Sequence, residues 1–488
     1  MSDLNTKIIN ATKWSLLAEV SAKLIAPISN IILARLLTPD AFGVVTTLTM
    51  IITFAEIFTD AGFQQYIIQH KFKDEEETHQ TANVAFWSNL VMSIVLWILI
   101  TLNSSDLAIL VGNPGLGHVL SIACLAIPIS SFSSIQMALY KRKFDFKTLF
   151  YTRIISILVP IIITVPLAFW LRNYWALVYG TIILNLANAI MLTVKSKWKP
   201  AFYYDFKKLK QMFSFCSWTL LHKILIWATN YIDIFFIGIF LNTYYLGIYK
   251  TSIATVGHIT TLITSSMIPI IMPALSRLQD NIPEMRTTIL KLQKYTAIIL
   301  LPLGVGIFVF SDLITDIMLG AQWKEASNFI AIWGLMEVLT VVFSHFCSNV
   351  YPAIGKPKVS VIAQTLHLIV LIPAIIIAVK YGFTCLYWTR SLVRLEGVLV
   401  NLTLVYILIK LSPYKIIKNV VPEFLGCIIM GIIGYSLLTL YNNTLISFVY
   451  IIICIIVYFT ILFMIPNERK CLFNILKRLR PFIKKAKS

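Results

Sequence analysis

Charged side chains that interrupt long apolar stretches are the residues of this sequence most able to do chemistry. A charge placed in hydrocarbon costs about 2.5–3.5 kcal/mol even on the more permissive scales, so it needs a partner charge or water. The cations in such stretches are Lys23, Lys223, Lys250, Arg390 and Arg394, and the acids are Glu19, Glu56, Asp60, Asp233, Glu337 and Glu396. They predict either ion pairs between helices or a polar cavity within the membrane.

Arg390 and Arg394 are four residues apart, so a helix presents both on one face. Glu396 follows Arg394 by two residues and points nearly opposite, which prevents it from neutralising the pair. Guanidinium groups match phosphate oxygens bidentately. Two hypotheses follow. Either the arginines bind an anion, most naturally a phosphate or an acidic sugar, or each pairs with an acid on another helix, such as Glu337.

Glu19 and Lys23 are also four residues apart, so they can pair on one helix face. The surrounding sequence recurs later in the chain at one constant offset: Trp14–Leu17 matches Trp218–Leu221, and Leu37–Gly43 matches Leu241–Gly247. This match predicts an internal duplication in which Lys223 corresponds to Glu19. The Glu19–Lys23 pair is then either a structural ion pair or, as the matching Lys223 favours, part of a cavity wall.

Glu56 and Asp60 share one face of the second apolar stretch. They predict either a site for a coupling cation or proton, to which Glu337 is a further candidate, or the end of a hydrogen-bond network. The sequence has no Cys-x-x-Cys motif, no Cys/His cluster, no nucleophile–base constellation and no Gly-rich phosphate loop. We therefore expect no metal site, no cofactor and no enzymatic activity.

The composition is that of a polytopic membrane protein. Of the 488 residues, 58% are hydrophobic and 13% are charged, and the mean hydropathy is +0.81. Stretches of about 20 apolar residues can cross ~30 Å of hydrocarbon, and backbone in lipid must satisfy its own hydrogen bonds, which makes them helices. We predict fourteen spans, near residues 13–35, 42–69, 82–102, 118–139, 149–171, 174–195, 212–240, 244–275, 288–310, 327–351, 358–379, 384–410, 420–440 and 445–465.

The Lys and Arg residues of the loops predict the orientation. With the N-terminus in the cytoplasm, nearly all loop cations are cytoplasmic, and only Arg35, Arg172, Lys324 and Lys380 fall outside. Both termini are therefore expected in the cytoplasm, and the net charge of +19 reflects these loops rather than a nucleic-acid partner.

The duplication divides the chain into expected parts. The spans are predicted to form two parallel six-helix repeats followed by two extra helices. The parts are an N-lobe at 1–211, a C-lobe at 212–419, spans thirteen and fourteen at 420–466, and a basic tail at 467–488. The tail is expected to lie on the anionic inner leaflet of the membrane.

Five short motifs occur in order along the chain: Ala34–Gly43, Thr59–Gly62, Ile67–Gln69, Gly320–Trp323 and Ile354–Pro357. In sequence and spacing they resemble landmarks of the bacterial Wzx-type polysaccharide and O-antigen flippases, which belong to the multidrug/oligosaccharidyl-lipid/polysaccharide exporter superfamily. The resemblance implies an all-α, MATE-like fold of two six-helix lobes around a central cavity. It also implies translocation of undecaprenyl-pyrophosphate-linked oligosaccharide across the bacterial inner membrane by alternating access, for cell-surface polysaccharide such as lipopolysaccharide.

The implied partners are the lipid-linked glycan and membrane lipid, with polysaccharide polymerase machinery as a further candidate. The cations Lys23, Lys223, Lys250, Arg390 and Arg394 agree with a pyrophosphate or acidic glycan cargo, although none of them is a family motif position. The identity of the glycan stays open.

Two other functions are weighed against this one. A cation-coupled multidrug or metabolite exporter of the same fold would favour an acidic cavity, whereas the charges here are mixed to basic. A membrane glycan polymerase or acyltransferase would need a large outer loop or clustered catalytic residues, and the sequence has neither.

Overall fold

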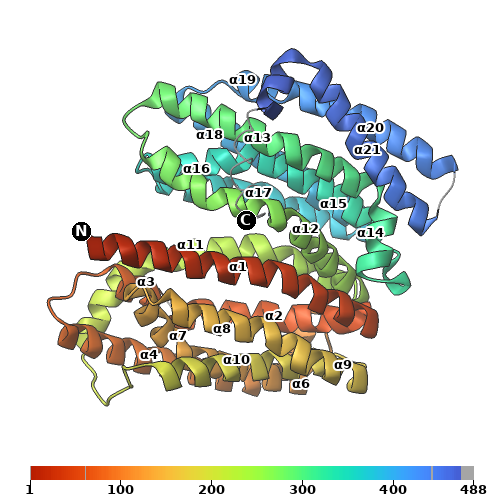
Figure 1. Ribbon diagram of the computed structural model, residues 1–488. Coiled ribbons are helices and arrows are strands. Elements are labelled where there is room, and N and C mark those ends of the chain that lie inside the picture. Colours follow the sequence, from red (N-terminus) through yellow and green to blue (C-terminus); the bar gives the residue numbers. More distant parts are fainter. Residues whose placement is uncertain (1, 61, 441–442, 474–488) are drawn as a thin grey trace, which may run out of the picture. The chain divides into compact units, whose positions relative to one another are not determined.

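The computed structural model describes the backbone of residues 2–60, 62–440 and 443–473; within helices, the side chains of residues 2–13, 16, 214–218 and 266–270 also lie outside the description. The expectation for the basic tail therefore falls mostly outside the described residues, as do the side chain of Trp218 and residue Ala61 of the Thr59–Gly62 motif. The secondary structure of the described residues is helical throughout (Figure 1).

The first half of the chain contains eleven of the α-helices. In chain order they are α1 (Ser2–Leu36), α2 (Pro39–Asp60), α3 (Phe63–Gln69), α4 (Glu75–Leu102), α5 (Ser104–Leu110), α6 (Gly117–Ala123), α7 (Ala126–Arg142), α8 (Phe146–Val159), α9 (Val165–Leu171), α10 (Trp175–Lys195) and α11 (Phe206–Phe240).

The remaining α-helices follow in the second half of the chain. They are α12 (Thr243–Ser276), α13 (Ile282–Val309), α14 (Ser311–Met318), α15 (Ala326–Thr340), α16 (Phe346–Ala353), α17 (Lys358–Val379), α18 (Phe383–Ile409), α19 (Pro413–Lys418), α20 (Val421–Leu440) and α21 (Thr444–Met464).

The prediction of an all-helical membrane protein is confirmed. Among the described residues, 13 helical stretches are long and apolar enough to cross a membrane. The remaining predicted span, 244–275, coincides with α12, which contains the side chains at 266–270 that are not described. The total of fourteen spans therefore stays a prediction.

Several predicted spans are interrupted for identifiable reasons. The span predicted at 42–69 is divided between α2 and α3 at Gly62, whose φ of 92° lies in the left-handed region that favours glycine. A π-helical turn at Pro160–Thr164 interrupts the span predicted at 149–171. Proline has no N–H to donate and its ring crowds the preceding turn, so the helix widens there.

The chain forms two compact units. The first comprises Met1–Thr251 and Leu371–Leu386, and the second comprises Ser252–Val370 and Tyr387–Ser488. The helix α11 and the start of α12 thus belong to the first unit. These units are defined by contacts and not by sequence repeats, so the expected lobe boundaries at 211 and 419 stay a prediction.

The two copies of the duplicated turn meet within the first unit. A Cβ atom on Gly43 would lie 1.8 Å from the carbonyl oxygen of Thr243, and one on Gly247 would lie 1.9 Å from the carbonyl oxygen of Pro39. Pro39 and Thr243 correspond to each other in the two copies, as do the two glycines, so the contact is reciprocal. Two-fold-related surfaces make contacts of this kind, which supports the predicted parallel duplication.

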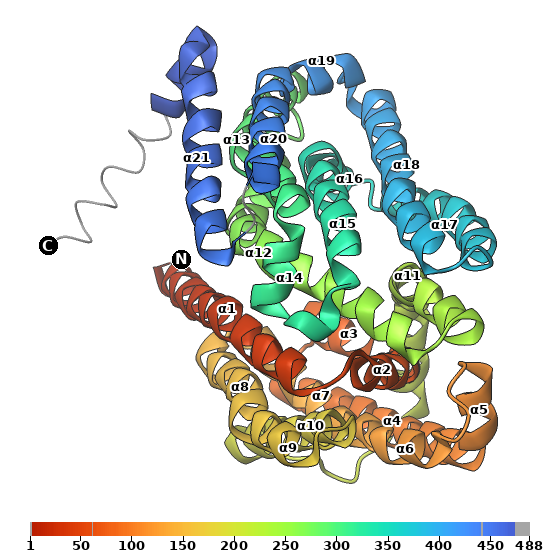
Figure 2. The same ribbon diagram turned by 90° about the vertical axis from the view of Figure 1, so that its right-hand side faces the viewer.

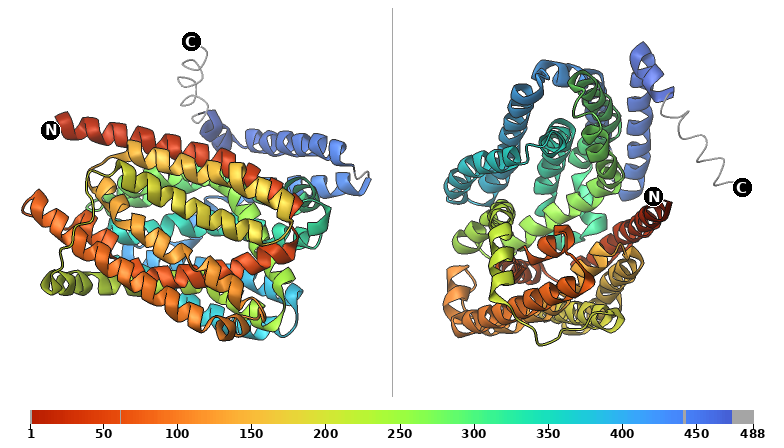
Figure 3. Two further views of the ribbon diagram at one scale, coloured as in Figure 1. Left: turned by 90° about the horizontal axis from the view of Figure 1, so that it is seen from below. Right: turned by 90° about the vertical axis from the view of Figure 1, so that its left-hand side faces the viewer.

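In the second unit, α20 and α21 form an antiparallel pair that packs against α13 (Figures 1 and 3). Lys294 of α13 forms ion pairs with two acids in this part of the second unit. Its ammonium nitrogen lies 2.9 Å from Glu423 Oε1 and 2.7 Å from Glu468 Oε1, and it donates to the carbonyl oxygen of Asn419 at 2.8 Å. Both carboxylates are almost fully buried. Glu423 lies in α20, and Glu468 lies four residues after the end of α21, so the buried ion cluster ties α20 and the segment after α21 to α13.

The glycine contact predicts a matched pair of substitutions. Gly43→Ala places a methyl group on a backbone oxygen that cannot move without its helix, so we expect a loss of about 1–3 kcal/mol of stability. Gly257→Ala in α12 meets no atom within 4 Å and should be neutral or slightly stabilising, because alanine favours helix more than glycine does. Thermal unfolding in detergent measures both. Equal midpoints for the two variants would contradict the close contact.

The ion cluster predicts a second comparison. Lys294→Met leaves two buried carboxylates without their cation, and breaking a buried pair in this way costs about 3–5 kcal/mol. Lys291→Met removes an exposed lysine one turn earlier on the same helix and should have little effect. Thermal unfolding in detergent, with proteolysis just after α21 as a local readout, distinguishes the two. A similar loss in both variants would show that the cluster contributes nothing specific.

Candidate functional site

The first unit pairs two of the predicted site residues that the sequence does not connect. Lys223 of α11 forms an ion pair with Asp60, the last residue of α2. Both side chains are partly buried, at 27% and 17% relative exposure. The duplication matches Lys223 to Glu19, and spacing associates Asp60 with Glu56, so neither signal predicts the pairing of α2 with α11.

Aromatic packing brings α2 and α11 together. The rings of Phe54 and Trp227 lie 4.6 Å apart between centroids. The indole nitrogen of Trp227 also donates to Thr53 Oγ1 at 3.2 Å. Trp227 lies one turn after Lys223 on α11, so the same face of this helix carries the anchoring ring and the charge. An aromatic residue four positions from an intramembrane lysine is the signal that could have indicated this pairing.

Glu56 lies one turn before Asp60 on α2, and its Oε1 accepts a hydrogen bond of 2.8 Å from Ser130 Oγ on α7. A hydrogen bond from another helix is what we expect if Glu56 and Asp60 end a hydrogen-bond network. The coupling hypothesis requires in addition that an ion or proton reach Glu56 or Asp60, and that requirement stays a prediction.

The other predicted residues of the first unit lie on α1, α11 and α12. Glu19 and Lys23 form the expected pair at 3.5 Å, with the carboxylate half exposed. The Lys250 ammonium lies 5.0 Å from the centroid of the Tyr231 ring, a cation–π distance. Asp233 is buried and accepts a hydrogen bond from the Tyr249 hydroxyl.

The second unit gathers the arginine pair around one tryptophan. The guanidinium carbons of Arg390 and Arg394 lie 5.4 Å and 4.4 Å from the centroid of the Trp333 ring. Arg394 pairs with Glu337, as one of the two hypotheses expects, and its Nε donates to Thr340 Oγ1 at 3.2 Å. Arg390 is buried, with 7% of its surface exposed.

The spacing along α15 explains this cluster. Trp333 and Glu337 are four residues apart, so α15 presents a ring and a carboxylate on the face that meets the two arginines of α18. Glu396 Oε2 instead lies 2.8 Å from His367 Nδ1, in agreement with its predicted position on another face. Trp333 was not among the residues predicted from the sequence, although a tryptophan one turn from an intramembrane acid was visible there.

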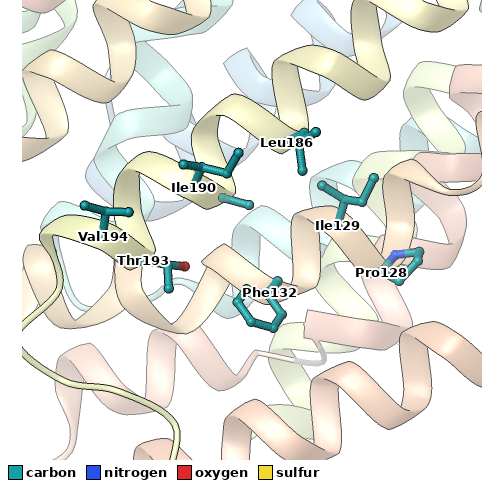
Figure 4. A pocket seen from close by; sticks show the side chains of 8 residues that line it. Pro128, Ile129, Phe132, Leu186, Ile190, Thr193 and Val194 are labelled. Carbon is teal, nitrogen blue, oxygen red and sulfur yellow. The ribbon is translucent and has the colours of Figure 1, made fainter.

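Two pockets of the described residues have apolar walls that contain none of the predicted site residues. Figure 4 shows one of about 440 Å³ between α7 and α10, lined by side chains such as Ile129, Phe132, Leu186 and Ile190 and by none of the predicted site residues. A second apolar pocket, also of about 440 Å³, lies in the second unit among α12, α13, α14, α20 and α21. Among the described residues, no group of three or more His, Cys, Asp or Glu side chains is placed to hold a metal ion.

Comparison with solved structures shows the fold. The lipid II flippase MurJ, in an inward closed conformation, aligns over 93% of this chain and 98% of its own, with a TM-score of 0.74 and 17% identity. An inward-facing MATE-family multidrug transporter aligns over 80% of this chain and 94% of its own, with a TM-score of 0.63 and 13% identity. The predicted MATE-like architecture is therefore confirmed.

Comparison with characterised sequences adds two relatives. The teichuronic acid biosynthesis protein TuaB of Bacillus subtilis is 22% identical over 439 residues, which cover 89% of this chain and 90% of TuaB. The lipopolysaccharide biosynthesis protein WzxC of Escherichia coli is 22% identical over 66% of this chain and 65% of its own length.

A family model described as "Polysaccharide biosynthesis protein" matches residues 32–328. This match spans more than half of the 488 residues and includes the spans that carry Asp60, Lys223 and Lys250. The chain is thus a multi-pass membrane protein that belongs to the polysaccharide biosynthesis family.

Proposed function

We propose that the protein is a flippase that moves an undecaprenyl-pyrophosphate-linked oligosaccharide across the bacterial inner membrane by alternating access. The observation that carries this proposal is the cluster of Arg390, Arg394 and Trp333 inside a chain of the polysaccharide biosynthesis family. Relatives whose names describe flippases support it: a probable glycan biosynthesis flippase of Haloferax volcanii among sequences, and MurJ among structures.

The cargo's head group explains why cations are kept inside the membrane. A pyrophosphate is doubly charged or more, and moving it through hydrocarbon without compensation is prohibitively costly. Guanidinium groups offer paired donors at the spacing of phosphate oxygens. The proposed role of the cations is to replace the water that the pyrophosphate loses.

The ion pairs suggest how such cations are held between transport cycles. Lys223 pairs with Asp60, Lys23 with Glu19 and Arg394 with Glu337, so three of the five cations are neutralised within their own unit. We propose that the anionic head group competes with these carboxylates, takes over a cation on arrival and returns it on release. In such an exchange the head group gains a cation, and the displaced carboxylate needs a proton or another cation for its charge to stay compensated.

The same pairs support a coupling role for the acids. A carboxylate displaced from its cation becomes a better acceptor for a proton or a cation. Asp60 and Glu337 are therefore proposed coupling residues, and Glu56, one turn before Asp60 on α2, completes the proposed set. The orientation with both termini in the cytoplasm, and an association with polysaccharide polymerase machinery, are likewise part of the proposal.

The alternative function is a cation-coupled multidrug or metabolite exporter, which the MATE-like fold permits. The two functions differ in their cargo and so in what deletion of the protein removes. A flippase mutant loses surface polysaccharide and accumulates lipid-linked intermediate, whereas an exporter mutant keeps its polysaccharide and becomes drug-sensitive.

The arginine cluster gives the sharpest test. Arg394→Gln should abolish surface polysaccharide in the native host while the protein remains in the membrane, because a phosphate-binding cation is lost. Arg394→Gln combined with Glu337→Gln removes the same cation without leaving an unpaired carboxylate. Polysaccharide extracted from whole cells is the measurement, with membrane protein amount as the control.

The outcome of the double variant decides the role of Arg394. Continued loss of polysaccharide is expected if the cation binds the cargo. Recovery of polysaccharide in the double variant would show that Arg394 only neutralises Glu337, and would overturn the anion site. Gln substitution of Arg172, which lies on a predicted outer turn, is the matched control and should leave the polymer unchanged.

The pair on α1 gives a second test. Exchanging the residues, as Glu19→Lys with Lys23→Glu, allows an ion pair to form again but moves the cation by one turn, about 6 Å along the helix. We expect clearly reduced surface polysaccharide, because the cargo then meets the cation at the wrong depth. Wild-type polymer from the exchanged variant would identify the pair as purely structural.

A further inference from the structure

A polar pocket of about 370 Å³ lies within the first unit among α1, α7, α8 and α10. These helices are neighbours, with α1 beside α8 and α8 beside α10 (Figure 2). The hydroxyl-bearing and amide side chains in its wall are Ser15, Thr152, Ser156 and Asn188, and its charged side chains are Glu19, Lys141 and Arg153. None of the apolar pockets described above has such a wall.

The two cations of this pocket differ from others nearby in their contacts. Lys143, two residues after Lys141, pairs with Glu75 at 3.1 Å, and Arg142 donates to the carbonyl oxygens of Ile67 and His70 at 2.7 Å each. The side chains of Lys141 and Arg153 form no ion pair or hydrogen bond with any described residue. Two cations therefore face one pocket without a carboxylate to pair with.

The acid in the pocket wall does not remove this imbalance. Glu19 is paired with Lys23 at 3.5 Å on its own helix. Its charge is thus already matched, and Lys141 and Arg153 leave the pocket with an excess of positive charge. Unpaired ammonium and guanidinium groups on one pocket bind oxyanions, of which phosphate is the best match for a guanidinium fork.

Aromatic and basic side chains lie beside two residues of the pocket wall, Ser15 and Phe150. The ring of Trp14 lies 5.0 Å from that of Phe150, and the Lys147 ammonium lies 6.0 Å from the Trp14 ring centroid. The Lys195 ammonium lies 4.3 Å from the centroid of the Tyr151 ring. Tryptophan, tyrosine and lysine gather where a membrane meets water. This combination of side chains is typical of the depth of lipid head groups.

We propose that this pocket binds the phosphate group of an anionic phospholipid of the surrounding membrane. Lys141 and Arg153 contact the phosphate oxygens, while Ser15 and Asn188 contact hydroxyl groups of the head group. The acyl chains remain in the bilayer beside α1 and α8. The pocket wall includes Glu19 of the Glu19–Lys23 pair, but its two unpaired cations, Lys141 and Arg153, have no part in the proposed flippase activity, and lipid binding is measured without transport.

The test is lipid binding to the full-length protein in detergent, followed by native mass spectrometry. Phosphatidylglycerol is the probe, and phosphatidylcholine, which has the same phosphate but no net charge, is the comparison lipid. We expect one tightly held phosphatidylglycerol. Lys141→Gln with Arg153→Gln should weaken its binding at least about tenfold, because hydrogen bonds to a charged group are lost.

Matched variants separate the pocket from the overall charge. Lys143→Gln with Arg172→Gln removes the same two charges outside the pocket and should leave binding unchanged. Lys141→Arg with Arg153→Lys keeps both charges and should retain binding. Ser15→Leu keeps both charges but fills the pocket, and it should weaken binding as strongly as the loss of the cations.

Three results would overturn the proposal. Equal weakening by the pocket and control double variants would show general charge attraction. Normal binding by Ser15→Leu would place the lipid elsewhere. Binding of inorganic phosphate or pyrophosphate without any retention of phosphatidylglycerol would assign the pocket to a soluble phosphate compound instead of a lipid. Size-exclusion chromatography of every variant confirms that the protein compared is folded.

Discussion

A charge inside a membrane protein must find a partner on a neighbouring helix, and this requirement organises both compact units. Lys223 joins α11 to α2 through Asp60, and Arg394 joins α18 to α15 through Glu337. Lys294 joins α13 to α20 through Glu423 and to the segment after α21 through Glu468. Each pair costs desolvation and returns attraction only at close range. The charges therefore specify which helices are neighbours more than they add to stability.

The ion pairs differ in how far they are exposed to solvent. This difference agrees with two roles, in which one pair holds helices together and the others contact the proposed cargo. The Lys294 cluster is the most buried, with two carboxylates that are almost completely enclosed. The Lys223–Asp60 and Arg394–Glu337 pairs keep part of their surface exposed. A pair that an anionic cargo is proposed to open has to be reachable, whereas a pair that fastens two helices does not.

Much of the architecture could be predicted because it depends on local sequence. Hydropathy is sufficient to identify the membrane helices, and the i, i+4 spacing of Glu19 with Lys23 is sufficient to predict their ion pair. Partners on different helices were harder to assign. Glu337 is among the candidate partners of Arg394, but the sequence names no partner for Lys223, because a repeat aligns corresponding positions and does not show which helices touch. Trp227 and Trp333 each lie one turn from an intramembrane charge, but this spacing does not show which helix the ring meets, so the sequence alone assigns neither to a site.

The crossing of the duplicated turns at Gly43 and Gly247 has a consequence for how the two halves can diverge. Each glycine faces a main-chain oxygen of the other copy, and a main-chain oxygen is present whatever residue carries it. No substitution in one half can therefore make room for a side chain in the other. Most positions of a duplicated gene can diverge because a change in one copy is compensated by a change in the other. No such compensation is possible here, so both Gly43 and Gly247 have to remain glycine.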